Sequence, residues 1–121
     1  MKRSLLIVIA LTLNYLGCGL CGEDSKHEIK STDGRYVATV FVRNCGATTP
    51  YVTHLNLREV GENFKPDSNG VIVEGEVYTV KGQAEIKVSW SSESSLLIET
   101  IGGPEVLGKE KSWKEVTINY K

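Results

Sequence analysis

The chain has 121 residues, with 14 Lys and Arg against 15 Asp and Glu, and its formal net charge is −1. This length fits one domain, and it suffices to bury a core without metals or many crosslinks. Because the two signs of charge are evenly mixed, the sequence offers no basic stripe for nucleic acid. We therefore expect a single domain that does not bind DNA or RNA.

Residues 1–20 have the layout of a secretory signal. Lys2 and Arg3 are followed by residues 5–16 (LLIVIALTLNYL), an almost uninterrupted apolar run. That arrangement predicts export of the remaining chain to a bacterial cell envelope, in the periplasm or anchored at the outer surface. A membrane-spanning helix needs about 20 apolar residues. The uncharged stretch 4–22 nearly reaches that length, so an uncleaved anchor helix stays open as an alternative.

The apolar run ends in Gly17-Cys18-Gly19-Leu20-Cys21-Gly22. A small residue before a cysteine at this place resembles a bacterial lipobox, in which the cysteine thiol receives diacylglycerol. We expect either lipidation at Cys18 or an ordinary cleavage near Gly19. A lipid on Cys18 would anchor the domain to the membrane, because each buried methylene contributes about 0.8 kcal/mol.

Three cysteines are present. If Cys18 belongs to the signal or carries a lipid, Cys21 and Cys45 remain, and an oxidising compartment predicts a disulfide between them. This disulfide would close a loop of about 25 residues and stabilise the fold by roughly 3 kcal/mol. Two free thiols, the alternative, would require a reducing compartment.

The first part of the exported chain is predicted to lack regular structure. Residues 23–30 (EDSKHEIK) are polar and indicate an arm or linker, and a turn follows at 31–34 (STDG). The arm and the turn together make up an N-terminal segment over residues 21–35. Residues 36–43 (YVATVFVR) form a β-branched and aromatic run, which is typical of a strand buried on both faces. A loop follows at 44–50 (NCGATTP).

Residues 51–57 (YVTHLNL) alternate with a period of two, which predicts a half-buried strand. His54 lies on its polar side together with Asn56, so we expect an exposed or cross-strand histidine. Residues 61–70 (GENFKPDSNG) form a polar loop that ends in an Asn-Gly turn.

The next apolar segments, 71–73 and 77–81, are out of phase unless a bulge or turn at Gly75 shifts the register. Gly82-Gln83 fits a two-residue hairpin turn into a strand over 84–90, where apolar and polar residues alternate cleanly.

A turn at 91–95 precedes a strand over 96–101, and residues 116–120 close the domain with one apolar face. These elements predict an all-β domain over residues 36–121, an antiparallel meander of six to seven strands folded into a small sandwich or an incomplete barrel. The expected core consists of Tyr36, Val40, Val42, Leu55, Leu57, Ile86, Val88, Trp90, Leu97, Val116 and Ile118.

Four short segments, taken together, form a further pattern. They are Cys21-Gly22, Ser31-Thr32-Asp33-Gly34-Arg35-Tyr36, Asn44-Cys45-Gly46-Ala47-Thr48-Thr49 and Val52-Thr53-His54-Leu55. They resemble the common core of a family of small, uncharacterised bacterial exported or membrane-anchored proteins, some of them lipoproteins. In that family Pro stands at the position of Thr32 and Asp at the position of Asn44. The resemblance covers about a third of the chain. It implies the Cys21–Cys45 pair and brings no known activity.

Catalytic and metal-binding patterns are weak. Cys45 lies nine residues before His54, a spacing that would suit a thiol–imidazole nucleophile. Such a nucleophile needs a free thiolate, whereas the compartment favours a disulfide. No histidines or cysteines have the spacing of a metal site, and Cys18 and Cys21 straddle the processing site. We therefore expect no enzyme, no metal and no cofactor.

The sequence favours a non-enzymatic envelope protein that binds a protein or glycan partner, because loops on rigid scaffolds commonly carry binding. The loop supplies amides and hydroxyls that could hold an anion or a partner's backbone. It could equally be a tight loop held by the disulfide. The candidate binding residues are Asn44, Gly46, Ala47, Thr48, Thr49 and His54. The alternatives are a structural or stress-related lipoprotein without a ligand, an immunity or inhibitor protein, and a Cys-dependent enzyme.

Overall fold

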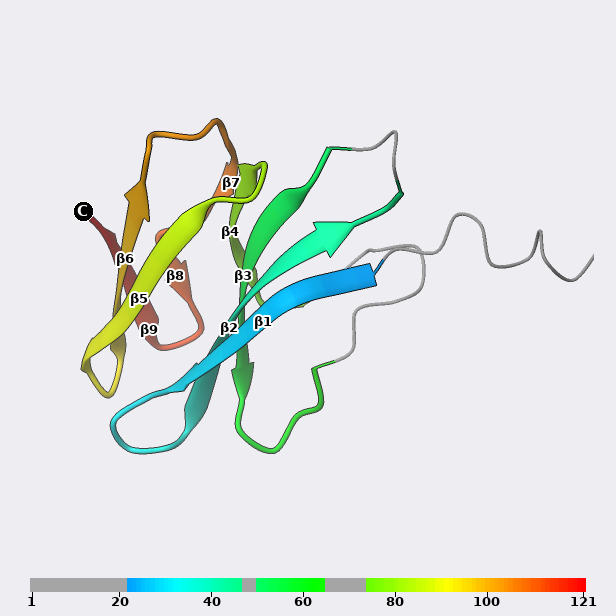
Figure 1. The fold of residues 1–121 in the computed structure, drawn as a ribbon. Helices are drawn as coiled ribbons and strands as arrows, with labels where there is room; N and C mark the ends of the chain where they lie inside the picture. The colour runs from blue at the N-terminus through cyan, green and yellow to red at the C-terminus, as the bar shows by residue number, and fades with distance from the viewer. Residues whose placement is uncertain (1–21, 47–49, 65–73) are drawn as a thin grey trace, which may run out of the picture.

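The computed structural model describes residues 22–46, 50–64 and 74–121 (Figure 1). The described strands are β1 (Gly22–Lys30), β2 (Tyr36–Asn44), β3 (Val52–Glu59), β4 (Glu76–Lys81), β5 (Glu85–Ser92), β6 (Ser95–Ile101), β7 (Val106–Lys109), β8 (Ser112–Trp113) and β9 (Val116–Tyr120). They form sheet A, in the order β1-β2-β3-β4-β7, and sheet B, in the order β5-β6-β9-β8. The all-β prediction is confirmed, and the described strands do not close into a barrel. The expected signal or anchor helix lies outside the described residues.

Sheet A begins as the predicted meander. Strands β1 to β4 follow one another in chain order with antiparallel pairing, and β7 adds to the free edge of β4. Strand β2 is buried on both faces over most of its length, as its β-branched and aromatic run predicts. Strand β3 is buried on both faces at its centre as well, so the prediction of a half-buried strand is wrong.

The meander prediction fails after β4. Gly82 has a φ of +87°, but β4 and β5 belong to different sheets, so the predicted hairpin is a crossing from sheet A to sheet B. The Thr53 hydroxyl holds this crossing, because it donates to the Gly82 carbonyl oxygen at 2.6 Å and accepts from the Ala84 amide at 2.9 Å. The chain then returns to sheet A as β7, and β9 consequently pairs with β6 in parallel.

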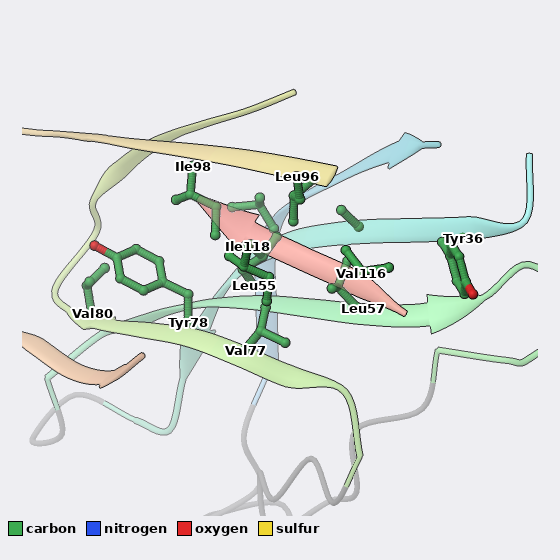
Figure 2. Close-up of a cluster of buried hydrophobic side chains, with 12 residues drawn as sticks. Tyr36, Leu55, Leu57, Val77, Tyr78, Val80, Leu96, Ile98, Val116 and Ile118 are labelled. Carbon is green, nitrogen blue, oxygen red and sulfur yellow. The ribbon is translucent and has the colours of Figure 1, made fainter. Parts of the chain in front are cut away.

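The core lies between the two sheets (Figure 2). Its buried members are Tyr36, Ala38, Val40, Leu55, Leu57, Val77, Tyr78, Val80, Leu96, Ile98, Val116 and Ile118, and Ile86, Val88 and Trp90 pack against them with partial burial. The prediction of Leu97 as a core residue is wrong, since Leu96 and Ile98 point inward instead. Because Leu96, Leu97 and Ile98 are three consecutive apolar residues, the sequence does not indicate which of them face the core. Pairing with β5 places Leu96 opposite Trp90 and Ile98 opposite Val88, which also pack against the core.

The predicted arm or linker over 23–30 is wrong, because these residues belong to strand β1. The strand pairs with β2 from Gly22 opposite Asn44 to Lys30 opposite Val37. Trp90 of β5 donates its indole N–H to the Ile29 carbonyl oxygen at 3.1 Å. Strand β1 is an edge strand, and polar edge strands discourage pairing with other chains, so a polar sequence is compatible with a strand here.

Gly75 lies directly before the shift of register that the sequence predicts near β4. Its φ is +80°, and its carbonyl oxygen accepts from the Leu57 amide at 2.7 Å. A Cβ at this position would lie 1.9 Å from the Leu57 carbonyl oxygen. The ladder between β3 and β4 shifts directly afterwards, which allows the adjacent Val77 and Tyr78 both to be buried.

We predict that Gly75→Ala destabilises the domain far more than Gly34→Ala does. Gly34 has a similar φ of +74°, but a Cβ added there would meet no atom within 4 Å, so its substitution costs only the conformational penalty of about 1–2 kcal/mol. Gly75→Ala adds a backbone clash, and we expect a loss above about 3 kcal/mol. Urea unfolding of both variants measures the difference, and equal losses would contradict the role assigned to Gly75.

Candidate functional site

Three connections lie together at one end of the sandwich, at the top of Figure 1. Their described residues are 45–46 and 50–51 between β2 and β3, 82–84 between β4 and β5, and 102–105 between β6 and β7. The Gly82 amide donates to the Tyr51 carbonyl oxygen at 2.7 Å, and the Lys81 amide donates to the Glu105 carbonyl oxygen at 2.9 Å. We call this end, with Ile101 at the end of β6 and the first residues of β7, the loop end.

The predicted binding loop belongs to the loop end. Asn44 accepts a hydrogen bond from the Gly46 amide through Oδ1 at 3.1 Å, and Gly46 has a φ of +113°. This side-chain turn fixes the start of the loop. Ala47, Thr48 and Thr49 lie outside the described residues.

Cys45 is disulfide-bonded, and its partner is not among the described residues. The ladder between β1 and β2 ends with Gly22 opposite Asn44, one residue from each member of the predicted pair. Cys21 and Cys18 precede the described residues, so the Cys21–Cys45 disulfide and the lipid on Cys18 stay predictions.

Exposed apolar side chains gather at the loop end. Among the described residues the exposed large hydrophobic side chains are Tyr51 (38%), Val60 (49%), Ile101 (42%), Val106 (46%) and Leu107 (54%). All except Val60 belong to the loop end; the Val60 amide binds the Arg35 carbonyl oxygen at the opposite end of sheet A. The sequence does not indicate this grouping, because β7 was not predicted and because the residues are far apart in the chain.

A second group of candidate residues covers the face of sheet A that points away from the core. We call it the outer layer, and it consists of Thr39, Phe41, Arg43, His54, Asn56, Arg58, Glu76 and Thr79. Thr39 and Phe41 are fully buried, and His54 and Asn56 are 7% and 3% exposed. His54 is therefore a buried cross-strand residue and not an exposed one.

His54 is held on two sides. Its ring stacks on Phe41, with ring centroids 5.0 Å apart and planes within 8°, and Nδ1 pairs with Oε1 of Glu76. The Thr79 hydroxyl donates to the same carboxylate oxygen at 2.9 Å. A proton on Nδ1 suits this carboxylate, so Nε2 is left to interact elsewhere. Because Nε2 is buried without a hydrogen-bond partner, the hypothetical Cys45–His54 pair is not formed.

Arg58 ties several elements of sheet A together. It donates through Nη1 to the Thr39 hydroxyl at 2.7 Å, through Nη2 to Glu28 at 3.0 Å and through Nε to the Glu62 carbonyl oxygen at 3.0 Å. These bonds connect β3 to β1, to β2 and to the segment that follows β3. The Arg58 side chain is only 14% exposed, so its bonds are partly shielded from water.

We predict that Arg58→Met lowers the free energy of unfolding by about 2 kcal/mol, because the buried Thr39 hydroxyl loses its partner. Arg35→Met is the matched control. Arg35 pairs with Glu115 at 3.4 Å between side chains that are 58% and 70% exposed, and we expect a loss of at most about 1 kcal/mol. Urea unfolding measures both variants. A loss at Arg58 no larger than that at Arg35 would show that the three hydrogen bonds do not stabilise the sheet.

Within the described ranges, no group of three or more His, Cys, Asp or Glu residues is arranged to hold a metal ion. His27 is exposed in β1, whereas His54 is buried in β3. A search of the same part of the chain for a helix long and apolar enough to cross a membrane found none.

The family resemblance of residues 21–57 stays a prediction and carries no activity with it. Comparisons with protein-family models, with curated proteins and with solved structures found no match for this chain.

Proposed function

We propose that this chain is an exported, non-enzymatic envelope protein that binds a protein partner through the loop end. The observation that carries the proposal is the grouping of exposed apolar side chains, since four of the five among the described residues belong to this end. Where such side chains form one contiguous surface, they mark interaction sites on soluble domains. Scattered apolar side chains would carry no such meaning.

Hydrogen bonds connect the described segments of the loop end to one another, which favours binding. The buried Thr53 hydroxyl fixes the β4–β5 crossing, and the Tyr51 and Glu105 carbonyl oxygens tie the neighbouring connections to it. A surface that is already ordered loses little conformational entropy when a partner docks, so more of the contact energy appears as affinity.

The chemistry of the loop end fits a protein better than a glycan. Ile101, Val106 and Leu107 are aliphatic and form no side-chain hydrogen bonds, so they gain free energy by apolar burial. A glycan presents hydroxyl groups that need polar partners when water is removed. An envelope inhibitor that caps a toxin is one form of this proposal. A structural lipoprotein without a ligand is its rival.

The rival proposals make different predictions for Leu107→Ser. Burying a Leu side chain contributes about 1.5–3 kcal/mol. A partner that covers Leu107 should therefore bind the variant at least tenfold more weakly, since about 1.4 kcal/mol is a factor of ten. Val60→Ser changes a similarly exposed apolar residue at the opposite end and should leave binding unchanged.

The measurement uses the mature full-length protein, immobilised and incubated with envelope extract. Retained proteins are quantified by mass spectrometry for the wild type and both variants, and the affinity for the main retained protein is then determined. No protein retained by the wild type, or equal retention by Leu107→Ser and Val60→Ser, would reject the loop end as a binding surface.

Export and crosslinking have a test of their own. We predict that the intact mass of the mature protein corresponds to a chain shortened near Cys18, with or without a diacylglycerol, and that reduction adds the mass of two hydrogen atoms. The disulfide state of Cys45 supports the second part. A full-length, uncut chain in the cytosol with all thiols reduced would contradict both parts.

A further inference from the structure

Two side-chain nitrogens of the outer layer are buried without a hydrogen-bond partner: Nη2 of Arg43 and Nε2 of His54. They are the two such side-chain atoms found in the described part of the chain. The His54 side chain is only 9% exposed, so water does not solvate its ring. Buried polar atoms without partners are rare in folded proteins because each one costs stability. Two of them on one face of a sheet make this face a candidate binding site.

The two residues are neighbours. Arg43 lies opposite Val52 in the β2–β3 ladder, and Phe41 lies opposite His54, so Arg43 and His54 are diagonal neighbours on the same face. Such residues have Cβ atoms about 7–8 Å apart, within reach of a long side chain. Both also contact the Phe41 ring, from which the Arg43 guanidinium carbon is 5.7 Å and the His54 ring centroid 5.0 Å.

The surrounding groups select the charge of the ligand. Glu76 pairs with Nδ1 of His54, and Arg43 remains positive. A metal ion on Nε2 would be repelled by the Arg43 guanidinium. A hydrogen-bond acceptor on Nε2 requires the imidazolium form, and the charges of Arg43, His54 and Glu76 then sum to one positive charge. A single negative charge balances this site, whereas a dianion would leave excess negative charge beside Glu76.

We propose that Arg43 and His54 form a binding site for one carboxylate group on the outer face of sheet A. One carboxylate oxygen accepts a hydrogen bond from Nη2 of Arg43, and the other accepts from Nε2 of His54. Glu76 and Thr79 position the imidazole, and Phe41 supplies apolar surroundings that strengthen both bonds. The carboxylate belongs either to a small organic acid or to an acidic side chain of the partner, because Arg43 directly precedes the loop end.

Acetate is the probe for this site. The mature protein is labelled with ¹⁵N in its histidine rings and titrated with sodium acetate at constant pH and ionic strength, with sodium chloride as the reference salt. We expect a saturable shift of the His54 Nε2 resonance. His27, the other histidine of the chain, is exposed in β1 and serves as the internal control that should not respond. A linear drift, equal at both histidines, would overturn the proposal.

Variants of Arg43 separate a specific site from a general salt effect. Arg43→Gln should weaken acetate binding at least tenfold, and Arg43→Lys should retain part of it because the charge remains. Circular dichroism confirms that each variant is folded. Acetate binding by a folded Arg43→Gln at wild-type affinity would overturn the proposal. If Arg43→Gln fails to fold, Arg43→Lys tests the proposal instead. Acetate binding by Arg43→Lys at wild-type affinity would show that the guanidinium does not bind the ligand, and it would overturn the proposal.

The protein capture experiment described above, repeated with Arg43→Gln, identifies the source of the carboxylate. Loss of both acetate and partner binding in Arg43→Gln assigns the carboxylate to an acidic residue of the partner. Loss of acetate binding alone assigns it to a small organic acid, and both results support the site. The absence of a saturable shift would reject the site without affecting the Leu107→Ser result, so this proposal and the proposed function fail separately.

Discussion

Strands β2 and β3 are buried on both faces: one face packs into the core between the sheets, and the other carries the outer layer. Their ladder sets the position of everything else in sheet A. It brings β1 and β4 to either side, places Phe41 against His54 and places Thr39 beside Asn56. Strands enclosed in this way need side chains that satisfy both environments, with apolar residues inward and paired polar residues outward.

The outer layer meets this requirement unevenly. Arg58 uses all three of its guanidinium nitrogens, and Asn56 donates to the Glu74 carbonyl oxygen at 2.8 Å. Arg43 and His54 each keep a buried nitrogen without a partner. This contrast within one face separates polar groups that stabilise the fold from groups whose hydrogen-bond partners the fold does not supply.

The two proposed sites share one end of β2 and β3 but have opposite chemistry. The loop end presents aliphatic side chains to solvent, whereas Arg43 and His54 of the outer layer each keep one buried nitrogen without a hydrogen-bond partner. Thr53 connects the outer layer to the loop end, since it lies next to His54 in β3 and its hydroxyl holds the β4–β5 crossing. Most protein interfaces combine an apolar contact area with a few charge-assisted hydrogen bonds, and this end of the molecule offers both.

The sequence by itself determined the local preferences: the β2 run, the single apolar face of β9, the turn at Gly34, the irregularity at Gly75 and the place of the loop at residues 44–50. Each follows from propensities or periodicity within a few residues. Only the tertiary structure decided that the polar residues of β1 form an edge strand, that Leu96 and Ile98 rather than Leu97 face the core, and that β9 pairs with β6 in parallel. It also decided that His54 is buried and that Tyr51, Ile101 and Leu107 share one end. These features depend on which strands become neighbours, and pairing between residues far apart in the chain leaves no local pattern to detect.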